Sequence, residues 1–182
     1  MPIQVMNTGL GGLFSSRINM NLREKNGYSY GASSSFVFRR GAGPFLIGTG
    51  VRTDATAPAV KEIFNELALM RTTRMTDDEL RIAKDSFARS LPGLFETTPD
   101  AAASVGQLFV YDLPLDYYSA LPKKIDAVTG EEIERVAAKY LTPEKMVIIA
   151  VGDRSKIEPE LEKIKLGAIE LRGLDGKIST SK

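Results

Sequence analysis

The chain has 182 residues, 43% apolar and 26% charged, which is the composition of one ordinary globular domain with a sizeable core. Its net charge of +1 argues against nucleic acid or an acidic membrane as the main partner, because either would require an excess of Lys and Arg. Cysteine and histidine are both absent, which excludes disulfides, thiol catalysis, a Ser-His-Asp triad and a histidine-rich zinc site.

The first patterned element is a short helix that follows a glycine pair. Residues 2–8 before it are poorly patterned. Phe14, Ile18 and Leu22 recur at i, i+4 and i+8, which predicts a helix with one apolar face. A hydroxyl of the serine pair 15–16 could cap its start. Gly27 suits its end, because glycine adopts the left-handed conformation at little cost.

A hairpin is predicted next. Residues 28–39 alternate aromatic and small polar side chains, which is typical of a strand. Residues 39–44 (RRGAGP) predict a turn, and residues 45–53 predict a second strand. Because the connection is short, the two strands are expected to be antiparallel.

Helices dominate the remainder. Apolar periodicity predicts helices over residues 58–70, 76–92, 98–109, 115–128 and 129–137. Capping boxes at Thr76 and Thr129 open the second and the fifth of these.

The carboxyl-terminal part is expected to return to the sheet. The apolar run from Lys145 to Val151 predicts a buried strand, and residues 158–166 predict a terminal helix. Residues 1–172 then form a single domain, and residues 173–182 form a mobile tail. Strands far apart in the chain would share one mainly antiparallel sheet with helices on one face, an α+β two-layer sandwich.

One sequence motif resembles the non-catalytic second half of pitrilysin/insulinase-type zinc metallopeptidases. It consists of LGG-x-FSSR, then NLREK, and then a glycine and a tyrosine before a strand. These peptidases are the inverzincins, with an H-x-x-E-H motif in the catalytic half, and subunits of processing peptidase and of respiratory-complex cores are similar. The resemblance continues more loosely to about Asp153 and implies the metallopeptidase half-domain fold. It also implies an earlier strand, so the chain is expected to be an amino-terminally truncated fragment. A sheet edge without its neighbour could then pair with a second copy as a homodimer.

The resemblance implies a substrate-binding pair. Arg23 and Tyr30 stand where the family places an arginine and a tyrosine that face the chamber shared with the catalytic half. A guanidinium and a phenol held by rigid elements can donate hydrogen bonds to a peptide carbonyl. Alternatively, Arg23 only caps a helix end and Tyr30 packs in the core. Tyr28 is a further candidate that could equally be a packing residue, and Ser33 belongs to a serine run that could offer a strand edge to a peptide.

The glycines Gly9, Gly11 and Gly12 could suggest a phosphate loop. No G-x-x-x-x-G-K-[ST] sequence follows them, so close packing of the helix start is the favoured interpretation.

The function implied is therefore a substrate-clamping domain without catalytic or metal-binding residues of its own. Zinc would belong to a partner half, on the same polypeptide or on a separate subunit, and the pair would act on a peptide, in a bacterial cytoplasm or periplasm. Alone, this chain is expected to cleave nothing. One alternative is a structural or assembly subunit of the same fold, and another is an unrelated domain that binds a small molecule.

Overall fold

The computed structural model describes residues 1–178, and its architecture is α+β, as the sequence predicts. A two-stranded antiparallel sheet packs against helices that precede and follow it in the chain. The elements are α1 (Pro2–Asn7), α2 (Arg17–Asn19), β1 (Ser29–Phe36), β2 (Phe45–Val51), α3 (Thr56–Thr72), α4 (Asp77–Ser90), α5 (Thr98–Val110), α6 (Tyr117–Asp126), α7 (Gly130–Tyr140) and α8 (Arg154–Ile164).

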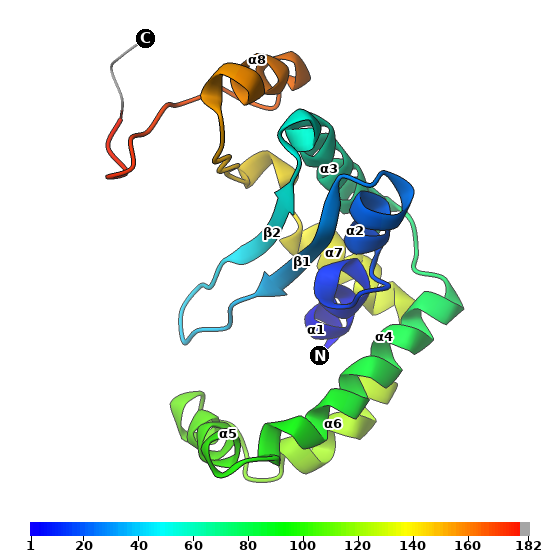
Figure 1. The fold of residues 1–182 in the computed structure, drawn as a ribbon. Helices are drawn as coiled ribbons and strands as arrows, with labels where there is room; N and C mark the ends of the chain where they lie inside the picture. The colour runs from blue at the N-terminus through cyan, green and yellow to red at the C-terminus, as the bar shows by residue number, and fades with distance from the viewer. Residues whose placement is uncertain (179–182) are drawn as a thin grey trace.

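The hairpin β1–β2 lies at the centre, with α1, α2, α3 and α7 to one side of it (Figure 1). Helices α4 and α6 run together away from this body and lead to α5, while α8 lies beside α3. The end of the α5 arm reaches back to the hairpin, where the Tyr111 hydroxyl donates to the Phe38 carbonyl at 3.1 Å and Arg40 pairs with Asp112 at 2.7 Å.

One apolar core joins the amino-terminal helices to α3, α6 and α7. Its side chains come from helix faces that repeat every three or four residues, which is the periodicity of an amphipathic helix. The largest fully buried apolar side chains are Val5, Met6, Leu10, Ile18, Leu22, Leu67, Met70, Ile125, Ile133 and Leu141.

The first residues are better ordered than their pattern predicts. Residues 2–7 form α1, and a wide helical turn over Thr8–Gly12 continues it. Val5 and Met6 are fully buried, and α1 packs against α7. Six residues are too few to display a helical period, which explains why the sequence did not reveal this helix.

The glycine pair serves close packing, as the favoured interpretation holds. A Cβ atom on Gly11 would lie 2.4 Å from Ser34 Oγ and 2.7 Å from Ser34 N. Asn7 binds the same serine, donating to its carbonyl oxygen at 3.0 Å and accepting from its hydroxyl at 2.8 Å. The backbone at Gly11 therefore packs directly against the backbone of β1 at Ser34.

Two details of the helix after the glycines differ from the prediction. Ile18 and Leu22 are fully buried, but Phe14 is 63% exposed, because the helix begins only at Arg17 and Phe14 lies in the preceding turn. Ser16 occupies the N-cap position but makes no capping hydrogen bond, since its hydroxyl donates to the Leu13 carbonyl.

The hairpin has the predicted antiparallel register. Ser33 pairs with Gly48 and Phe36 with Phe45, whose rings lie 4.5 Å apart between centroids. A bulge between Ser29 and Ala32 interrupts the ladder near the start of β1.

The helix starts are mostly confirmed. Thr76 and Thr129 form complete capping boxes at α4 and α7, each accepting from the amide of the glutamate three residues later. The cap of α5 is Thr97, and α8 begins at Arg154 after the cap Asp153, four residues earlier than predicted.

The predicted strand near the carboxyl terminus is wrong. Residues 146–151 follow a short helical turn at Pro143–Lys145 but join no sheet in the described part of the chain. Val147, Ile149 and Val151 are 86%, 85% and 91% exposed. Apolar composition predicted burial, but a strand also needs a neighbour for its backbone, and this segment lacks one here.

Part of the predicted tail forms a tight turn. Arg172 bridges to Ile178, and the Gly173 amide donates to the Lys177 carbonyl at 2.9 Å. Residues 179–182 of that tail lie outside the described residues. Within residues 1–178, no helix is both long enough and apolar enough to cross a bilayer.

Candidate functional site

A tight connection joins the two elements that carry Arg23 and Tyr30. The wide helical turn Met20–Lys25 ends at Gly27, whose φ of +61° is the left-handed conformation predicted for it. The Gly27 amide donates to the Arg23 carbonyl at 3.0 Å, and the Tyr28 amide donates to the Leu22 carbonyl at 2.8 Å. These bonds hold the Arg23 backbone and the entry to β1 in one fixed geometry.

The Arg23 side chain is partly exposed and is positioned by an aromatic ring. Its guanidinium carbon lies 4.1 Å from the centroid of the Phe14 ring, and its Nε lies 3.5 Å from Glu24 Oε1. A cation over an aromatic face is favoured by about 0.5–1 kcal/mol at an exposed site. In the described part of the chain, Arg23 donates no hydrogen bond to a helix carbonyl, so its N–H groups are not used for capping. The exposed position of Phe14 thus has an explanation, because its ring supports this guanidinium.

Tyr30 projects into solvent from the start of β1, at the bulge. It is 98% exposed, so the alternative interpretation of Tyr30 as a core residue is wrong. Arg23 and Tyr30 are therefore both accessible and lie on consecutive elements. Among the described residues, Arg23 contacts Phe14 and Glu24 while Tyr30 projects into solvent, so the two side chains do not contact each other.

The two lesser candidates differ in exposure. Tyr28 is half-buried and packs against the core, which favours its packing role. The Ser33 side chain is exposed, but the edge of β1 is not free for a peptide. On one side β1 pairs with β2, and on the other the Ala32 amide donates to Asn19 Oδ1 at 2.9 Å. On that same side the Ser34 carbonyl oxygen accepts from Asn7 at 3.0 Å, which disfavours peptide addition at residues 33–35, whereas β2 has no second partner strand among the described residues.

Two buried asparagines that the sequence analysis did not single out hold the site in place. Asn19 links the Phe14 carbonyl, at 2.6 Å, to the Ala32 amide next to the bulge. Asn21 donates to Glu62 at 2.9 Å and to Glu66 at 2.6 Å on α3. Asparagine competes with the helix for backbone bonds, so two asparagines inside a short helix were the signal that could have found them.

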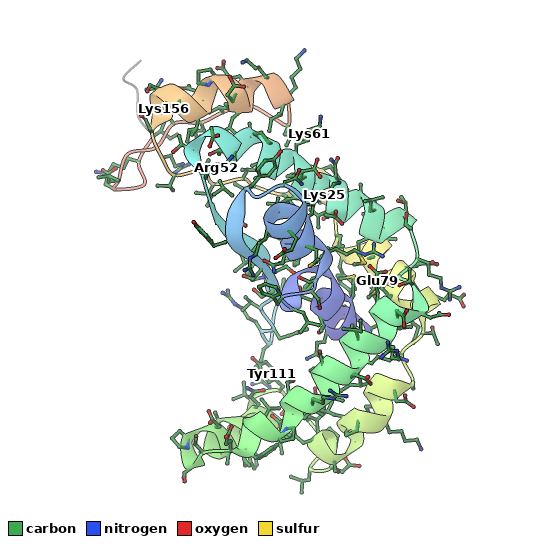
Figure 2. All side chains as sticks on the ribbon, turned by 45° about the vertical axis from the view of Figure 1, so that its right-hand side comes forward. Lys25, Arg52, Lys61, Glu79, Tyr111 and Lys156 are labelled. Atoms are coloured by element: carbon green, nitrogen blue, oxygen red, sulfur yellow. The ribbon has the colours of Figure 1, made fainter. Side chains whose placement is uncertain are left out.

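Arg17 anchors the same helix to α4. Its Nε and a terminal nitrogen donate to the two oxygens of Glu79 at 2.7 and 2.8 Å. The pKa of the Glu79 carboxyl is lowered and the pKa of Arg17 is raised, mainly because of these hydrogen bonds. Figure 2 shows Glu79 at the start of α4, where that helix meets the body.

Two grooves among the described residues lie near the candidate elements, and neither is lined by Arg23 or Tyr30. One of about 580 Å³ lies between the Met20–Lys25 turn and α3. A larger one of about 1160 Å³ lies between β2 and residues 146–152. Within residues 1–178, no three His, Cys, Asp or Glu side chains gather closely enough to hold a metal ion. Arg23 and Tyr30 therefore lie outside both of these grooves.

Comparison with known proteins identifies a family match and relatives of the same fold. Residues 1–87, which contain both candidate residues, match the family model of the peptidase M16 inactive domain. No curated protein matches the chain.

Solved structures share the fold. A peptidase M16 inactive domain from Pseudomonas fluorescens is 27% identical with a TM-score of 0.71, over 78% of this chain and 34% of that one. A conserved protein from Enterococcus faecalis V583 is 25% identical with a TM-score of 0.66, over 75% of this chain and 32% of that one. A protease from Helicobacter pylori, 21% identical over 78% of this chain and 34% of that one, has the same fold with a TM-score of 0.68. The chain thus spans about a third of the length of these proteins. Residues 1–87 thus match the peptidase M16 inactive-domain family, and the chain shares the fold of such a domain, in agreement with the resemblance of its LGG-x-FSSR and NLREK sequence.

Proposed function

We propose that this chain is the substrate-clamping domain of a zinc-dependent metalloendopeptidase, working with a partner half that carries H-x-x-E-H. The observation that supports it most directly is the presentation of Arg23 and Tyr30, since one is stacked on Phe14 and the other is 98% exposed. Both lie within the segment that matches the inactive domain.

The chemistry of the pair suits a peptide backbone. A guanidinium has five N–H donors in a fixed plane, and a phenol has one O–H donor. Together they can bind one carbonyl oxygen of an extended peptide, or two neighbouring ones, and hold it in register. Stacking on Phe14 and the tight turn at Gly27 limit the freedom of Arg23, so less entropy is lost when the peptide binds.

The partner half has to supply the metal. This chain has neither histidine nor cysteine, so it does not fit a catalytic zinc ion. Zinc bound in the partner would supply the activated water of a metallopeptidase. The residues of this chain bind and orient the peptide and exclude water by covering it.

A structural or assembly role is the alternative. A subunit that only supports a complex has no need for an exposed phenol and a guanidinium positioned by an aromatic ring, and this favours the clamping role. The two functions differ in what the loss of these groups does to turnover.

The test is peptide cleavage by the complete peptidase, with this chain joined to its H-x-x-E-H half. We expect Arg23→Ala to lower kcat/KM by about 10- to 100-fold, because a hydrogen bond from a charged donor contributes about 1.5–3 kcal/mol. Tyr30→Phe should lower it by a smaller factor. Lys156→Ala, at an exposed lysine on α8, is the control. Unchanged kcat/KM in both variants would support the structural role.

A further inference from the structure

The peptide bond between Gly27 and Tyr28 links the two elements of the candidate site, and it is held at both ends. Its N–H, from Tyr28, donates to a carbonyl of the preceding helical turn at 2.8 Å. Its carbonyl oxygen, from Gly27, accepts from a terminal nitrogen of Arg52 at 3.2 Å. The next carbonyl oxygen, from Tyr28, accepts from the Arg52 amide, also at 3.2 Å. Arg52 thus binds two consecutive carbonyl oxygens of this connection, one through its side chain and one through its backbone.

The connection needs such a restraint because it contains a glycine. Gly27 has a φ of +61°, and without a Cβ atom it reaches several backbone conformations at little cost. The peptide bond that follows it can therefore rotate, and a rotation would redirect the start of β1. Open space surrounds the position of a Cβ atom on Gly27 in the described structure, so packing does not prevent the rotation. Hydrogen bonds at both ends of the peptide bond oppose it instead.

Tyr30 depends on this restraint because the sheet does not fix its position. Ser29 pairs with Val51 and Ala32 pairs with Thr49, so two residues of β1 face one residue of β2 between these pairs. Tyr30 is the first of the two, and it lies where the ladder is irregular. Its direction is therefore set by what holds the chain just before the bulge, which is the restrained peptide bond.

Arg52 is itself held by a carboxylate two residues later. Its Nε and its second terminal nitrogen donate to the two oxygens of Asp54 at 3.2 and 3.4 Å. The pKa of the Asp54 carboxyl is lowered, mainly because of the hydrogen bond from the Arg52 side chain. Three nitrogens of one planar guanidinium thus join Asp54 to the Gly27 carbonyl. Figure 2 labels Arg52 between β2 and α3.

We propose that Arg52 is a positioning residue, which sets the direction of Tyr30 relative to Arg23 by holding the Gly27 carbonyl. This inference rests on the proposed function, and it adds a residue that acts without touching the peptide. A misplacement of about 1 Å can lower a rate by about 100-fold. We expect a smaller effect here, because the Arg52 side chain is 62% exposed and water can replace part of its bonding to Gly27.

Kinetics in two backgrounds separate positioning from direct binding. In the complete peptidase, acting on a peptide that it cleaves, Arg52→Ala should lower kcat/KM by about 3- to 10-fold. In the variant that combines Arg23→Ala with Tyr30→Phe, the same change should lower it by less than about 1.5-fold, because a positioning residue acts only through those two groups. An equal loss in both backgrounds would indicate direct binding or a general loss of stability, and would overturn the proposal. Arg81→Ala is the matched control, because Arg81 is also 62% exposed and pairs with two carboxylates on α4.

A conservative variant separates geometry from charge. Arg52→Lys keeps the positive charge but offers one nitrogen in place of three, so it cannot join Asp54 to the Gly27 carbonyl in the same way. We expect it to lose nearly as much kcat/KM as Arg52→Ala. Full activity of Arg52→Lys would show that only the charge matters, and the positioning role would then be wrong.

Hydrogen exchange in the full chain provides a measurement without activity. Exchange at the Tyr28 amide should be about threefold faster or more in Arg52→Ala, with an unchanged midpoint of urea unfolding. Unchanged exchange would overturn the proposal, since the peptide bond would then be held without Arg52. Unchanged kcat/KM in both Arg23→Ala and Tyr30→Phe would contradict the proposed function itself. Losses in those two variants without a loss in Arg52→Ala would contradict the positioning role alone.

Discussion

Arg17 binds Glu79 through two parallel hydrogen bonds, at 2.7 and 2.8 Å, across 62 residues of sequence. The same carboxylate accepts from the Thr76 amide at 2.8 Å and so completes the capping box of α4. One side chain thus ties the helix that leads to the candidate site to the start of the α4 arm.

Loss of this carboxylate should destabilise the fold. Glu79→Ala leaves the half-buried Arg17 without its partner and removes one bond of the capping box, so we expect a loss of about 1–3 kcal/mol in the free energy of unfolding. The partial exposure of the pair favours the lower half of that range. Asp78→Ala is the matched control, because Asp78 only pairs with exposed Arg81. Urea unfolding measures both, and equal effects in the two variants would contradict the anchoring role.

The same pair predicts a pH dependence. The pKa of Glu79 is lower in the folded chain than in the unfolded chain. Its contribution is therefore complete above the unfolded value of about 4.3 and is lost as the pH falls through the folded pKa. The difference in unfolding free energy between the unmodified chain and Glu79→Gln should be constant from pH 6 to pH 7 and shrink below pH 4. A difference that stays constant down to pH 3 would contradict the assignment.

Gly11 should tolerate no side chain. A Cβ atom there meets the backbone nitrogen and the hydroxyl of Ser34, and neither can move without breaking the contact between the helical layer and β1. Overpacking of this kind costs about 1–3 kcal/mol. We expect Gly11→Ala to lower the midpoint of urea unfolding, while Gly41→Ala, with open space around it and no positive φ, should not. Equal midpoints would refute the close approach.

Asn19 should control the order of the Tyr30 region. Asn19→Ala removes the acceptor of the Ala32 amide beside the β1 bulge and the donor to the Phe14 carbonyl. We expect faster hydrogen exchange at the Ala32 amide and a loss of about 1–3 kcal/mol in stability. Asn65→Ala, at an exposed residue of α3 that binds only Glu62, is the control. Unchanged exchange at Ala32 would show that the bulge holds without Asn19.

The sequence predicted those parts of the fold that depend on local chemistry. Capping boxes at Thr76 and Thr129, the positive φ of Gly27 and the antiparallel hairpin all follow from a few adjacent residues. Segment 146–151 was mispredicted, because a strand depends on a neighbour from elsewhere in the chain.

The candidate site was also predictable only in part from the sequence. The sequence motif shared with the family indicated Arg23 and Tyr30. The contact between the Arg23 guanidinium and the Phe14 ring was not predictable from it. In the sequence, Phe14 fits the apolar period of the helix and is expected to be buried. In the structure the helix begins only at Arg17, so Phe14 lies in the preceding turn and its ring contacts the Arg23 guanidinium.

The central claim is that Arg23 and Tyr30 bind the same peptide. A double-mutant cycle on kcat/KM of the complete peptidase tests it most directly, with Arg23→Ala, Tyr30→Phe and the combined variant. We predict that the combined loss is smaller than the product of the two single losses by at least threefold, because both groups hold one peptide segment. Single variants with unchanged kcat/KM, or losses that multiply without coupling, would contradict the account.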